Sequence, residues 1–171
     1  MEDIKQQEVQ ELYEKVYVKT LNFISHKPRS ISETQRRIFR YFPKKTEEDL
    51  RESLQQKIID DLVDDGYLDD ERYVAEYVGS FGKFGKKKSK YAITTFLYKK
   101  GIPKDLIQKG MLLLPGNFEL EAAIKDAEKR LRVYKDKNPR VLKSKVIKYL
   151  FSKGYTSEIV YNAVDTALGV K

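Results

Sequence analysis

The feature that most constrains the fold of this chain is an internal repeat in its sequence. FLYKKGIPKDLIQKGM, residues 96–111, aligns without gaps on YLFSKGYTSEIVYNAV, residues 149–164, so that a fixed shift of 53 residues relates the two segments. A weaker copy relates KPRSISETQRRIFRYF, residues 27–42, to NPRVLKSKVIKYLFSK, residues 138–153. Short repeats of this kind cannot bury an apolar face alone, so each one packs on its neighbours. The chain is therefore predicted to be a stack of similar units.

Each of these units is predicted to be helical. Apolar residues recur at helical spacing, prolines and glycines interrupt them at intervals, and no alternation typical of a strand persists. Nine helices are expected: one before Pro28, then 30–42, 46–65, 69–81, 89–100, 103–114, 117–137, 140–153 and 157–168. We therefore expect an all-α, elongated and curved chain of three tandem three-helix repeats, which would span residues 1–66, 67–115 and 116–171.

The helix ends carry recognisable signals. Ser30 and Glu33 form the pattern of a capping box. Gly66 stands where a left-handed residue would end a helix, and Asp69 or Asp70 can cap the helix that follows. Between them, Tyr67 and Leu68 are expected to fill the junction between two units.

Composition excludes several classes of protein. The chain has no cysteine and one histidine, which excludes a disulfide framework, thiol catalysis and cysteine-ligated metal sites. The N-terminus is acidic and polar, unlike a signal peptide, and no apolar run approaches the ~20 residues that span a membrane. A cytoplasmic protein is expected. The net charge of +8 and a pI near 9.4 suggest an anionic partner, with nucleic acid as the first candidate.

Acidic residues nevertheless gather around Gly66. The stretch DDLVDDGYLDDERYVAEYV, residues 60–78, contains Asp60, Asp61, Asp64, Asp65, Asp69, Asp70 and Glu71. With Gly66 as the sixth residue of an EF-hand loop, Val63 and Arg72 would take ligand positions, which excludes that calcium site. Carboxylates used for acid–base catalysis need a pocket that shifts their pKa, whereas a glycine turn suggests solvent. Neither metal binding nor catalysis is therefore favoured here.

Four of these acids need a further explanation, because they lie in the last turns of a predicted helix. Acids at that end oppose the helix dipole, at a cost of ~0.3–1 kcal/mol each on a surface. Either basic neighbours in the fold or a basic protein partner would favour them. The candidate partner-binding acids are Asp60, Asp61, Asp64 and Asp65.

Cations gather in segments that are poor in acids. The candidates for binding DNA or a DNA filament are Arg29, Arg36, Arg37, Arg40, Lys86, Lys87, Lys88, Lys90, Arg140, Lys143, Lys145 and Lys148. In the repeat alignment Arg29, Lys87 and Arg140 are equivalent, and each precedes or opens a helix, where the dipole disfavours a cation. Phosphate oxygens would be natural ligands for such residues. A solvated, lysine-rich face explains them equally well.

No pattern for catalysis or nucleotide hydrolysis is present in the sequence. GSFGKFGKKKS lacks the glycine spacing of a phosphate loop. His26 has no second histidine or cysteine for a metal or nucleophilic site, so a role at a helix end is favoured. Phe81 and Phe84 could stack on bases, but packing on the next helix is the favoured role. We expect neither an enzyme, a cofactor nor a metal site.

Taken in order, these segments resemble the RecX family of recombinase regulators over residues 17–168. The most specific segment is DDGYLDDERYV, in which Gly66, Tyr67, Leu68, Asp69 and Asp70 match the family's GYL(D/N)D junction. HKPRSISETQRRI, KKKSKYAITTFLYKKGI and YLFSKGYTSEIV resemble further family segments. Two features depart from the pattern: Lys86 replaces the usual proline after Gly85, and YFPKKTEED replaces the usual Lys-Gly-Phe turn of the first repeat.

The resemblance implies a protein without enzymatic activity that binds in the groove of the RecA–DNA filament and inhibits RecA. It would thereby modulate recombination, DNA repair and the SOS response, acting as a monomer without a cofactor. Its acidic first repeat would meet a basic recombinase surface, while the basic repeats face single- or double-stranded DNA or the filament's acidic lining. The alternative is a stand-alone nucleic-acid-binding helical protein that makes no contact with a recombinase.

Overall fold

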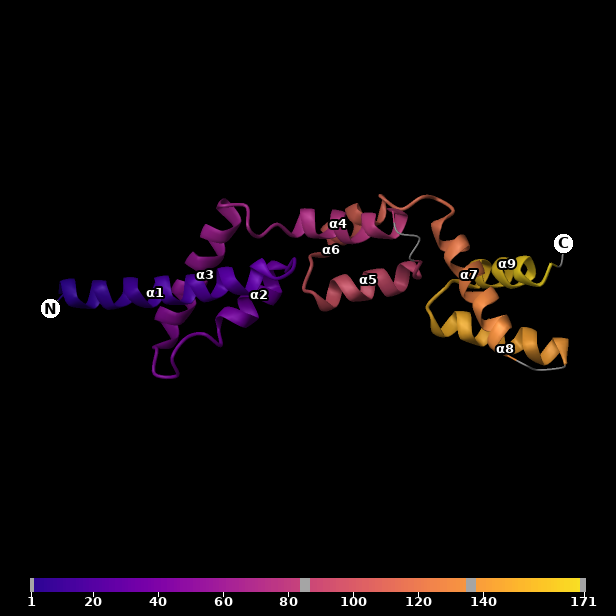
Figure 1. The fold of residues 1–171 in the computed structure, drawn as a ribbon, viewed down its shortest axis with the longest axis horizontal. Helices are drawn as coiled ribbons and strands as arrows, with labels where there is room; N and C mark the ends of the chain where they lie inside the picture. The colour runs from indigo at the N-terminus through magenta and orange to yellow at the C-terminus, as the bar shows by residue number, and fades with distance from the viewer. Residues whose placement is uncertain (1, 84–86, 135–137, 170–171) are drawn as a thin grey trace. The chain divides into compact units, whose positions relative to one another are not determined.

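The structure, a computed structural model, describes residues 2–83, 87–134 and 138–169 (Figure 1). Within these ranges the regular structure is entirely helical, which confirms the predicted all-α fold. The helices are α1 (Glu2–Ser25), α2 (Ile31–Ile38), α3 (Glu48–Asp64), α4 (Asp70–Lys83), α5 (Lys90–Lys99), α6 (Lys104–Met111), α7 (Phe118–Val133), α8 (Pro139–Ser152) and α9 (Ser157–Leu168).

The chain divides into two compact units. Unit 1 comprises Met1–Tyr73 and Lys100–Pro103, and unit 2 comprises Val74–Lys99 and Lys104–Lys171. Unit 1 thus contains α1, α2 and α3, and unit 2 contains α7, α8 and α9. Because the boundaries of the units fall within α4 and beside α5 and α6, the division into three repeats remains a prediction.

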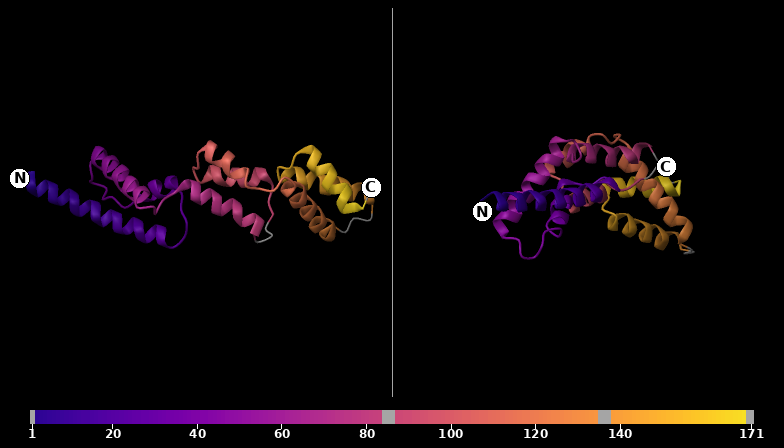
Figure 2. Two further views of the ribbon diagram at one scale, coloured as in Figure 1. Left: turned by 90° about the horizontal axis from the view of Figure 1, so that it is seen from above. Right: turned by 60° about the vertical axis from the view of Figure 1, so that its left-hand side comes forward.

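Unit 1 has a core between α1, α2 and α3. Val16, Ile38, Ile58 and Leu62 are fully buried there, because each helix turns one apolar stripe towards the other two. The first turns of α1 extend past the other helices of the unit, and Ile4 is exposed (Figures 1 and 2). The core therefore holds only the later turns of this long helix.

Gly66 ends α3 in the left-handed conformation, with φ of +72°, as the sequence predicts. The backbone N–H groups of Tyr67 and Leu68 both donate to the Leu62 carbonyl, at 2.9 and 3.0 Å. Leu68 is 1 % exposed, whereas Tyr67 is 55 % exposed. Leu68 is buried in the core of unit 1 and Tyr67 is exposed, so the filling of a junction between two repeats by both residues stays a prediction for Leu68 and is not what Tyr67 does.

In unit 2, α7, α8 and α9 form a three-helix cluster (Figure 1). Ala122, Ala123 and Ala127 are buried on one face of α7, and their small side chains allow the neighbouring helices to approach closely. Val146 of α8 and Val160 of α9 complete this part of the core. The cluster rests on small and β-branched side chains, which explains how such a lysine-rich segment folds.

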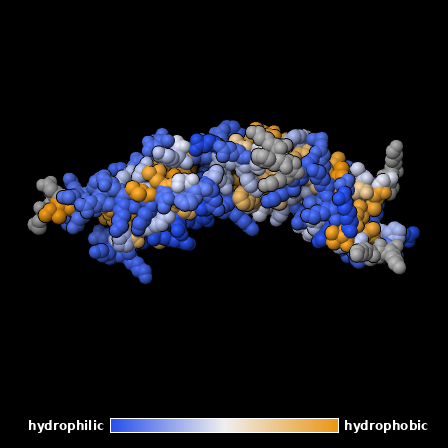
Figure 3. All heavy atoms as spheres, in the orientation of Figure 1, coloured by the Kyte–Doolittle hydropathy of each residue, from blue (hydrophilic) through white to orange (hydrophobic). Residues whose placement is uncertain are grey.

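The aromatic residue Phe81 of α4 packs inside unit 2. Its ring lies 5.2 Å from that of Tyr77 and 6.3 Å from that of Phe118, and the side chain is buried. This confirms the interpretation of Phe81 as a packing residue. Phe84 lies outside the described residues. The face of the protein that Figure 3 shows is mostly hydrophilic and has separate exposed hydrophobic patches.

The start of α8 differs from the expectation in one respect. The sequence predicts that Asn138-Pro139 ends the helix before it and that the next helix begins at Arg140, whereas Pro139 is the first residue of α8. The Asn138 side chain caps the helix and accepts from the N–H groups of Arg140 and Val141, at 3.0 and 3.4 Å. Proline suits the first helical position, where its missing N–H is not needed and its fixed φ is already helical.

Ser30 caps α2 and also binds a second helix end. Its Oγ accepts from the Glu33 N–H at 3.1 Å and the Glu33 carboxylate reaches back, which confirms the predicted capping box. The same hydroxyl donates to the carbonyl of Lys100, at 2.6 Å, just after the end of α5. One buried serine therefore satisfies a donor at the start of one helix and an acceptor at the end of another.

We call this connection between the start of α2 and the chain just after α5 joint 1. Two further contacts complete it. The Ile31 N–H, first in α2, donates at 3.0 Å to the Asp70 carboxylate, which begins α4. Gly101 has φ of +76°, and a Cβ there would lie 2.3 Å from the Ser32 Oγ. Only glycine fits this position, because it combines positive φ with the close approach.

The same chemistry recurs in unit 2, as joint 2. Ser89 precedes α5, and its Oγ accepts from the Ala92 N–H at 3.1 Å and donates to the Lys153 carbonyl at 2.5 Å. The N–H of Lys90, first in α5, donates to the Glu119 carboxylate of α7 at 3.3 Å. The carbonyl that Ser89 binds belongs to the end of α8, as the Lys100 carbonyl belongs to the end of α5.

The glycine of joint 2 is Gly154, the partner of Gly101 in the sequence repeat. It has φ of +81°, and a Cβ there would lie 2.4 Å from Cδ1 of Tyr91. Tyr91 stands two residues after Ser89, as Ser32 stands two residues after Ser30. The repeat in the sequence therefore corresponds to a repeated joint between helix ends.

Candidate functional site

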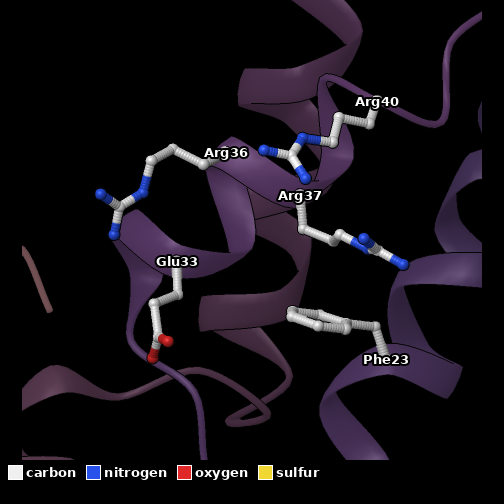
Figure 4. A pocket seen from close by; sticks show the side chains of 5 residues that line it. All are labelled: Phe23, Glu33, Arg36, Arg37 and Arg40. Atoms are coloured by element: carbon white, nitrogen blue, oxygen red, sulfur yellow. The ribbon is translucent and has the colours of Figure 1, made fainter.

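Unit 1 has a hollow lined by cationic residues around Phe23, which we call the cationic hollow. It consists of two adjoining cavities of about 440 and 370 Å³. Both cavities are lined by Phe23 and Arg37. The lining residues together are Lys19, Asn22, Phe23, His26, Arg29, Glu33, Arg36, Arg37, Arg40 and Tyr41. Figure 4 shows five of them, with the Arg37 side chain over the Phe23 ring. All of these residues come from α1, α2 and the segments that follow each helix.

Arg29 is held at the base of this hollow. Its guanidinium lies over the Phe23 ring, 4.1 Å from the centroid, and one nitrogen is 3.7 Å from the Glu33 carboxylate. Its Nε is buried without a hydrogen-bond partner among the described residues. A guanidinium stacked on a ring keeps its planar donors oriented, which suits phosphate or carboxylate oxygens.

Arg37 is fixed by aromatic rings as well. It lies 5.4 Å from the Phe23 centroid and 5.2 Å from the Tyr41 centroid, and its Nε donates to the Tyr41 hydroxyl at 3.0 Å. Arg36 and Arg40 are exposed and extend from the same helix end (Figure 4). The structure therefore brings all four predicted arginines of this region to one hollow.

Sequence reasoning missed the part that α1 contributes. Lys19, Asn22, Phe23 and His26 follow one another at the spacing of a single helix face. That periodicity is the signal that would have found them. The His26 Nδ1 donates to the Asn22 carbonyl at 2.6 Å, which confirms the predicted role of His26 at a helix end.

The other predicted cations divide into two that form ion pairs and several that are exposed or partly exposed. Lys87 pairs with Glu121, and Lys143 pairs with Asp165 at 2.7 Å, so both have partners within unit 2. The remaining described candidates are exposed or partly exposed, and they are Lys88, Lys90, Arg140, Lys145 and Lys148. Lys86 lies outside the described residues.

Arg29 and Lys87 precede a helix and Arg140 opens one, as the sequence predicts, but the three residues stand at different distances from the capping residue. Arg29 stands one residue before its cap, Ser30, and Lys87 stands two before Ser89. Arg140 instead follows the Asn138 cap and lies in the first turn of α8. The alignment without gaps missed this difference because it matched the two prolines rather than the capping residues.

Two of the four candidate acids are explained by α1. The Tyr13 hydroxyl donates to Asp61 at 2.5 Å, and the Tyr17 hydroxyl donates to Asp65 at 3.0 Å. The two rings are stacked 5.6 Å apart. Burial, and then the hydrogen bond to the carboxylate, raises the pKa of both tyrosines, so each hydroxyl stays protonated and remains a donor. Hydroxyl groups, rather than basic neighbours, therefore favour these two acids.

Asp60 and Asp64 occupy the other face of α3. Asp60 accepts a hydrogen bond from the Gln56 side chain at 2.8 Å, and Asp64 is exposed. Val63, which is exposed, lies at the spacing of the same helix face, whereas the exposed Tyr67 follows the turn at Gly66. The structure thus separates the four acids into an internal pair, Asp61 with Asp65, and an outward pair, Asp60 with Asp64.

Two further acids of the cluster, Asp69 and Asp70, serve the turn and joint 1. Asp69 caps α4, because its carboxylate accepts the Arg72 N–H at 2.8 Å. The Arg72 guanidinium donates to the Gly66 carbonyl at 2.8 Å. Asp70 is 8 % exposed, and burial raises its pKa against the opposing effect of the Ile31 N–H. A structural role therefore accounts for Asp69 and Asp70.

No group of three or more histidine, cysteine or acidic side chains is placed to hold a metal ion within the described ranges. In the same residues, no helix is long and apolar enough to cross a membrane.

The chain is similar to a known family model over its last three helices and to known proteins over most of its length. The family model described as "RecX, third three-helix domain" matches residues 118–164, which cover most of α7, α8 and α9. "Regulatory protein RecX" of Leuconostoc mesenteroides is 28 % identical over 148 residues, covering 86 % of this chain and 52 % of that protein. The protein of the same name from Streptococcus uberis is 30 % identical over 139 residues, covering 81 % and 51 %. The chain spans about half the length of these relatives.

Two solved structures have the same fold. The crystal structure of RecX from Lactobacillus salivarius covers 92 % of this chain and 97 % of its own, with a TM-score of 0.76 and 23 % identity. A crystal structure of regulatory protein RecX covers 96 % and 77 %, with a TM-score of 0.79 and 24 % identity. The structures support the fold. The chain is thus similar to RecX proteins in sequence over most of its length and in fold.

Proposed function

We propose that this chain inhibits a RecA-type recombinase by binding the groove of the recombinase–DNA filament, and that it does so without catalysis and as a monomer. It would thereby modulate recombination and DNA repair. The observation that carries the proposal is the cationic hollow of unit 1. In this hollow, Arg29 and Arg37 are oriented by Phe23 while Arg36 and Arg40 remain exposed. Oriented guanidinium groups beside exposed ones suit an anionic surface with many phosphate or carboxylate oxygens.

The outward acids give the same unit a second surface of opposite charge. Asp60 and Asp64 lie on the same face of α3 as the exposed side chain of Val63, and the exposed Tyr67 follows shortly after the helix end. Aromatic and aliphatic side chains beside charges are typical of protein interfaces. We infer that this face of α3 binds a basic surface of the recombinase, while the cations bind DNA or acidic lining of the filament.

The test is single-strand-dependent ATP hydrolysis by a preformed RecA filament, titrated with this protein at near-physiological salt. A fall in rate, with weak binding to naked DNA at the same salt, supports regulation of a recombinase. An unchanged rate, with tight binding to naked DNA, favours the stand-alone nucleic-acid-binding protein instead.

The role of the acidic face can be tested by charge reversal. Asp60→Lys with Asp64→Lys should weaken inhibition and leave the melting curve unchanged, because neither side chain bonds to another helix. The matched control is Glu8→Lys with Glu52→Lys, which makes the same change in charge at exposed positions. Equal inhibition by the two variants would contradict the assignment of this face.

A further inference from the structure

A second cationic surface lies on α7 in unit 2, where the sequence singled out no candidate. Lys125, Lys129 and Arg132 are exposed and, together with Lys87, line an open cavity of about 530 Å³. Their spacing places them on one helix face, and the helical rise of about 1.5 Å per residue extends the row over roughly 10 Å. The cations were missed because acids alternate with them along the sequence of α7.

The structure shows that most of these acids have partners inside unit 2. Glu119 accepts the N–H of Lys90, and Glu121 pairs with Lys87. The Asp126 carboxylate accepts the hydroxyl of Tyr155 at 3.0 Å, and burial raises the pKa of Tyr155, so this hydroxyl remains a donor.

The row brings like charges together on one helix face, and Glu128, four residues before Arg132, offsets this in part. Like charges three or four residues apart on a helix repel each other. No ion pair involves Lys125, Lys129 or Arg132 in the portion of unit 2 that the structure describes. Glu128 also lines the cavity, so the surface carries one exposed acid beside three exposed cations. An external polyanion would relieve this repulsion.

The lining favours nucleic acid over an acidic protein. Ala122 is the only apolar residue among the residues that line this cavity, and it is 1 % exposed. Protein interfaces depend on apolar and aromatic anchors, which this surface lacks. Interfaces with nucleic acid are more polar and more positively charged, and contacts to phosphates need no pocket for a base.

We propose that the α7 face formed by Lys125, Lys129 and Arg132, with Lys87 at its edge, binds consecutive phosphates of a nucleic-acid strand without reading its bases. This proposal deepens the proposed function, on which it rests, by naming the surface that holds DNA. The three exposed cations would each contact phosphate oxygens, and Lys87 would remain paired with Glu121.

The test compares the full chain with a triple variant, Lys125→Gln, Lys129→Gln and Arg132→Gln. Binding to a fluorescent oligothymidylate is measured by anisotropy over a series of salt concentrations. Each lost phosphate contact should lower the slope of log affinity against log salt by about 0.7 on a single strand, so the slope should fall by about 2. At low salt the affinity should fall about tenfold or more.

Two controls separate this surface from net charge and from folding. Lys5→Gln, Lys15→Gln and Lys45→Gln remove the same charge at exposed positions of unit 1 and should leave the slope close to that of the unchanged protein. Lys125→Arg, Lys129→Arg and Arg132→Lys keep the charge and should retain binding. A slope in the Gln variant equal to that of the unit 1 control would overturn the proposal, as would no binding by the unchanged protein at low salt.

Poly-glutamate tests the competing class of partner. If it binds the unchanged protein through these three residues while oligothymidylate does not, the surface serves acidic proteins and the proposal is overturned. The filament assay keeps the two hypotheses apart. Loss of DNA binding in the triple variant, with no effect of the unchanged protein on RecA, would support this surface and contradict the proposed function.

Discussion

Joint 1 and joint 2 share their backbone chemistry but differ in the charged side chains beside it. In both, a serine caps one helix and donates to a carbonyl at the end of another, and a left-handed glycine follows that carbonyl. In joint 1, Glu33 closes the capping box and pairs with Lys100 at 2.5 Å. In joint 2, Ala92 occupies the place of Glu33, and the Lys153 ammonium lies 5.3 Å from the ring centre of Tyr149.

This difference separates what specifies the joint from what adds to it. The serine, the glycine and a carboxylate bonded to the first helical N–H occur in both joints, since all three satisfy backbone groups or allow close approach. The ion pair occurs in joint 1 alone. A partly exposed ion pair contributes little to stability. Joint 2 therefore keeps the same backbone geometry although Ala92 stands where joint 1 has Glu33.

The largest effect is expected from adding a methyl group at the glycines. Gly154→Ala would force positive φ on alanine and bring its Cβ within 2.7 Å of three Tyr91 atoms. Strain and overpacking should together lower the free energy of unfolding by about 2–4 kcal/mol. Gly101→Ala should behave alike, and urea denaturation measures both. The control is Gly116→Ala, which has open space, and a comparable loss there would contradict this account.

Removal of the serine hydroxyls should have the next largest effect. Ser30→Ala and Ser89→Ala each lose a helix cap and leave a carbonyl without its donor, so each should cost about 1–3 kcal/mol. Denaturation curves of the two single variants test whether the joints are equivalent. A large loss from one variant and none from the other would show that they are not.

Asp70 should give joint 1 a dependence on pH. Because burial raises its pKa in the folded state above the ordinary value of 3.8, its contribution to stability is present below that pH and is lost as pH rises through the folded pKa. The stability of the unchanged protein relative to Asp70→Asn should therefore fall as pH rises above about 4, since asparagine keeps an acceptor for Ile31 without titrating. Unfolding of both proteins between pH 3 and 7 measures it, and a constant difference would contradict the prediction.

The smallest effect is expected from the charge that distinguishes the joints. Glu33→Gln keeps an acceptor for the Ser30 backbone and removes the ion pairs of Glu33 with Lys100 and with Arg29. A loss of about 0.5–1 kcal/mol is expected, and it should shrink in concentrated salt. Denaturation in 0.1 and 1 M salt tests this, and a loss as large as that of Ser30→Ala would show that the pair itself specifies the joint.

Local signals predicted the helices and their ends well. The last helix, 157–168, matches α9, and Ser30, Gly66 and Asp69 have the capping roles that neighbouring residues imply. These features depend on chemistry within a few residues, which the sequence displays directly. The family resemblance carried by the segments around Gly66 and Gly101 is likewise confirmed.

Long-range pairing could not be predicted in the same way. Tyr13 and Asp61 are 48 residues apart, and no local pattern relates them, so the acids of α3 suggested an external partner. Phe23 belongs to the hollow only because α2 folds against α1, which places two arginines over its ring. The cations of α7 were obscured because the partners of its acids, such as Tyr155, lie in other helices.

Each joint has a direction, because a serine at the start of one helix donates to a carbonyl at the end of another. The groups at the two sides of a joint are therefore different. A polar connector of this kind, left open at complementary ends, would link copy to copy into an open fibre. At α8 the capping residue is Asn138, which has no hydroxyl, and Pro139 has no N–H for a carboxylate. At the end of α2, Phe39 is right-handed, and no described residue from there to Phe42 is left-handed. Neither helix end therefore has the backbone and side-chain groups that form the joint.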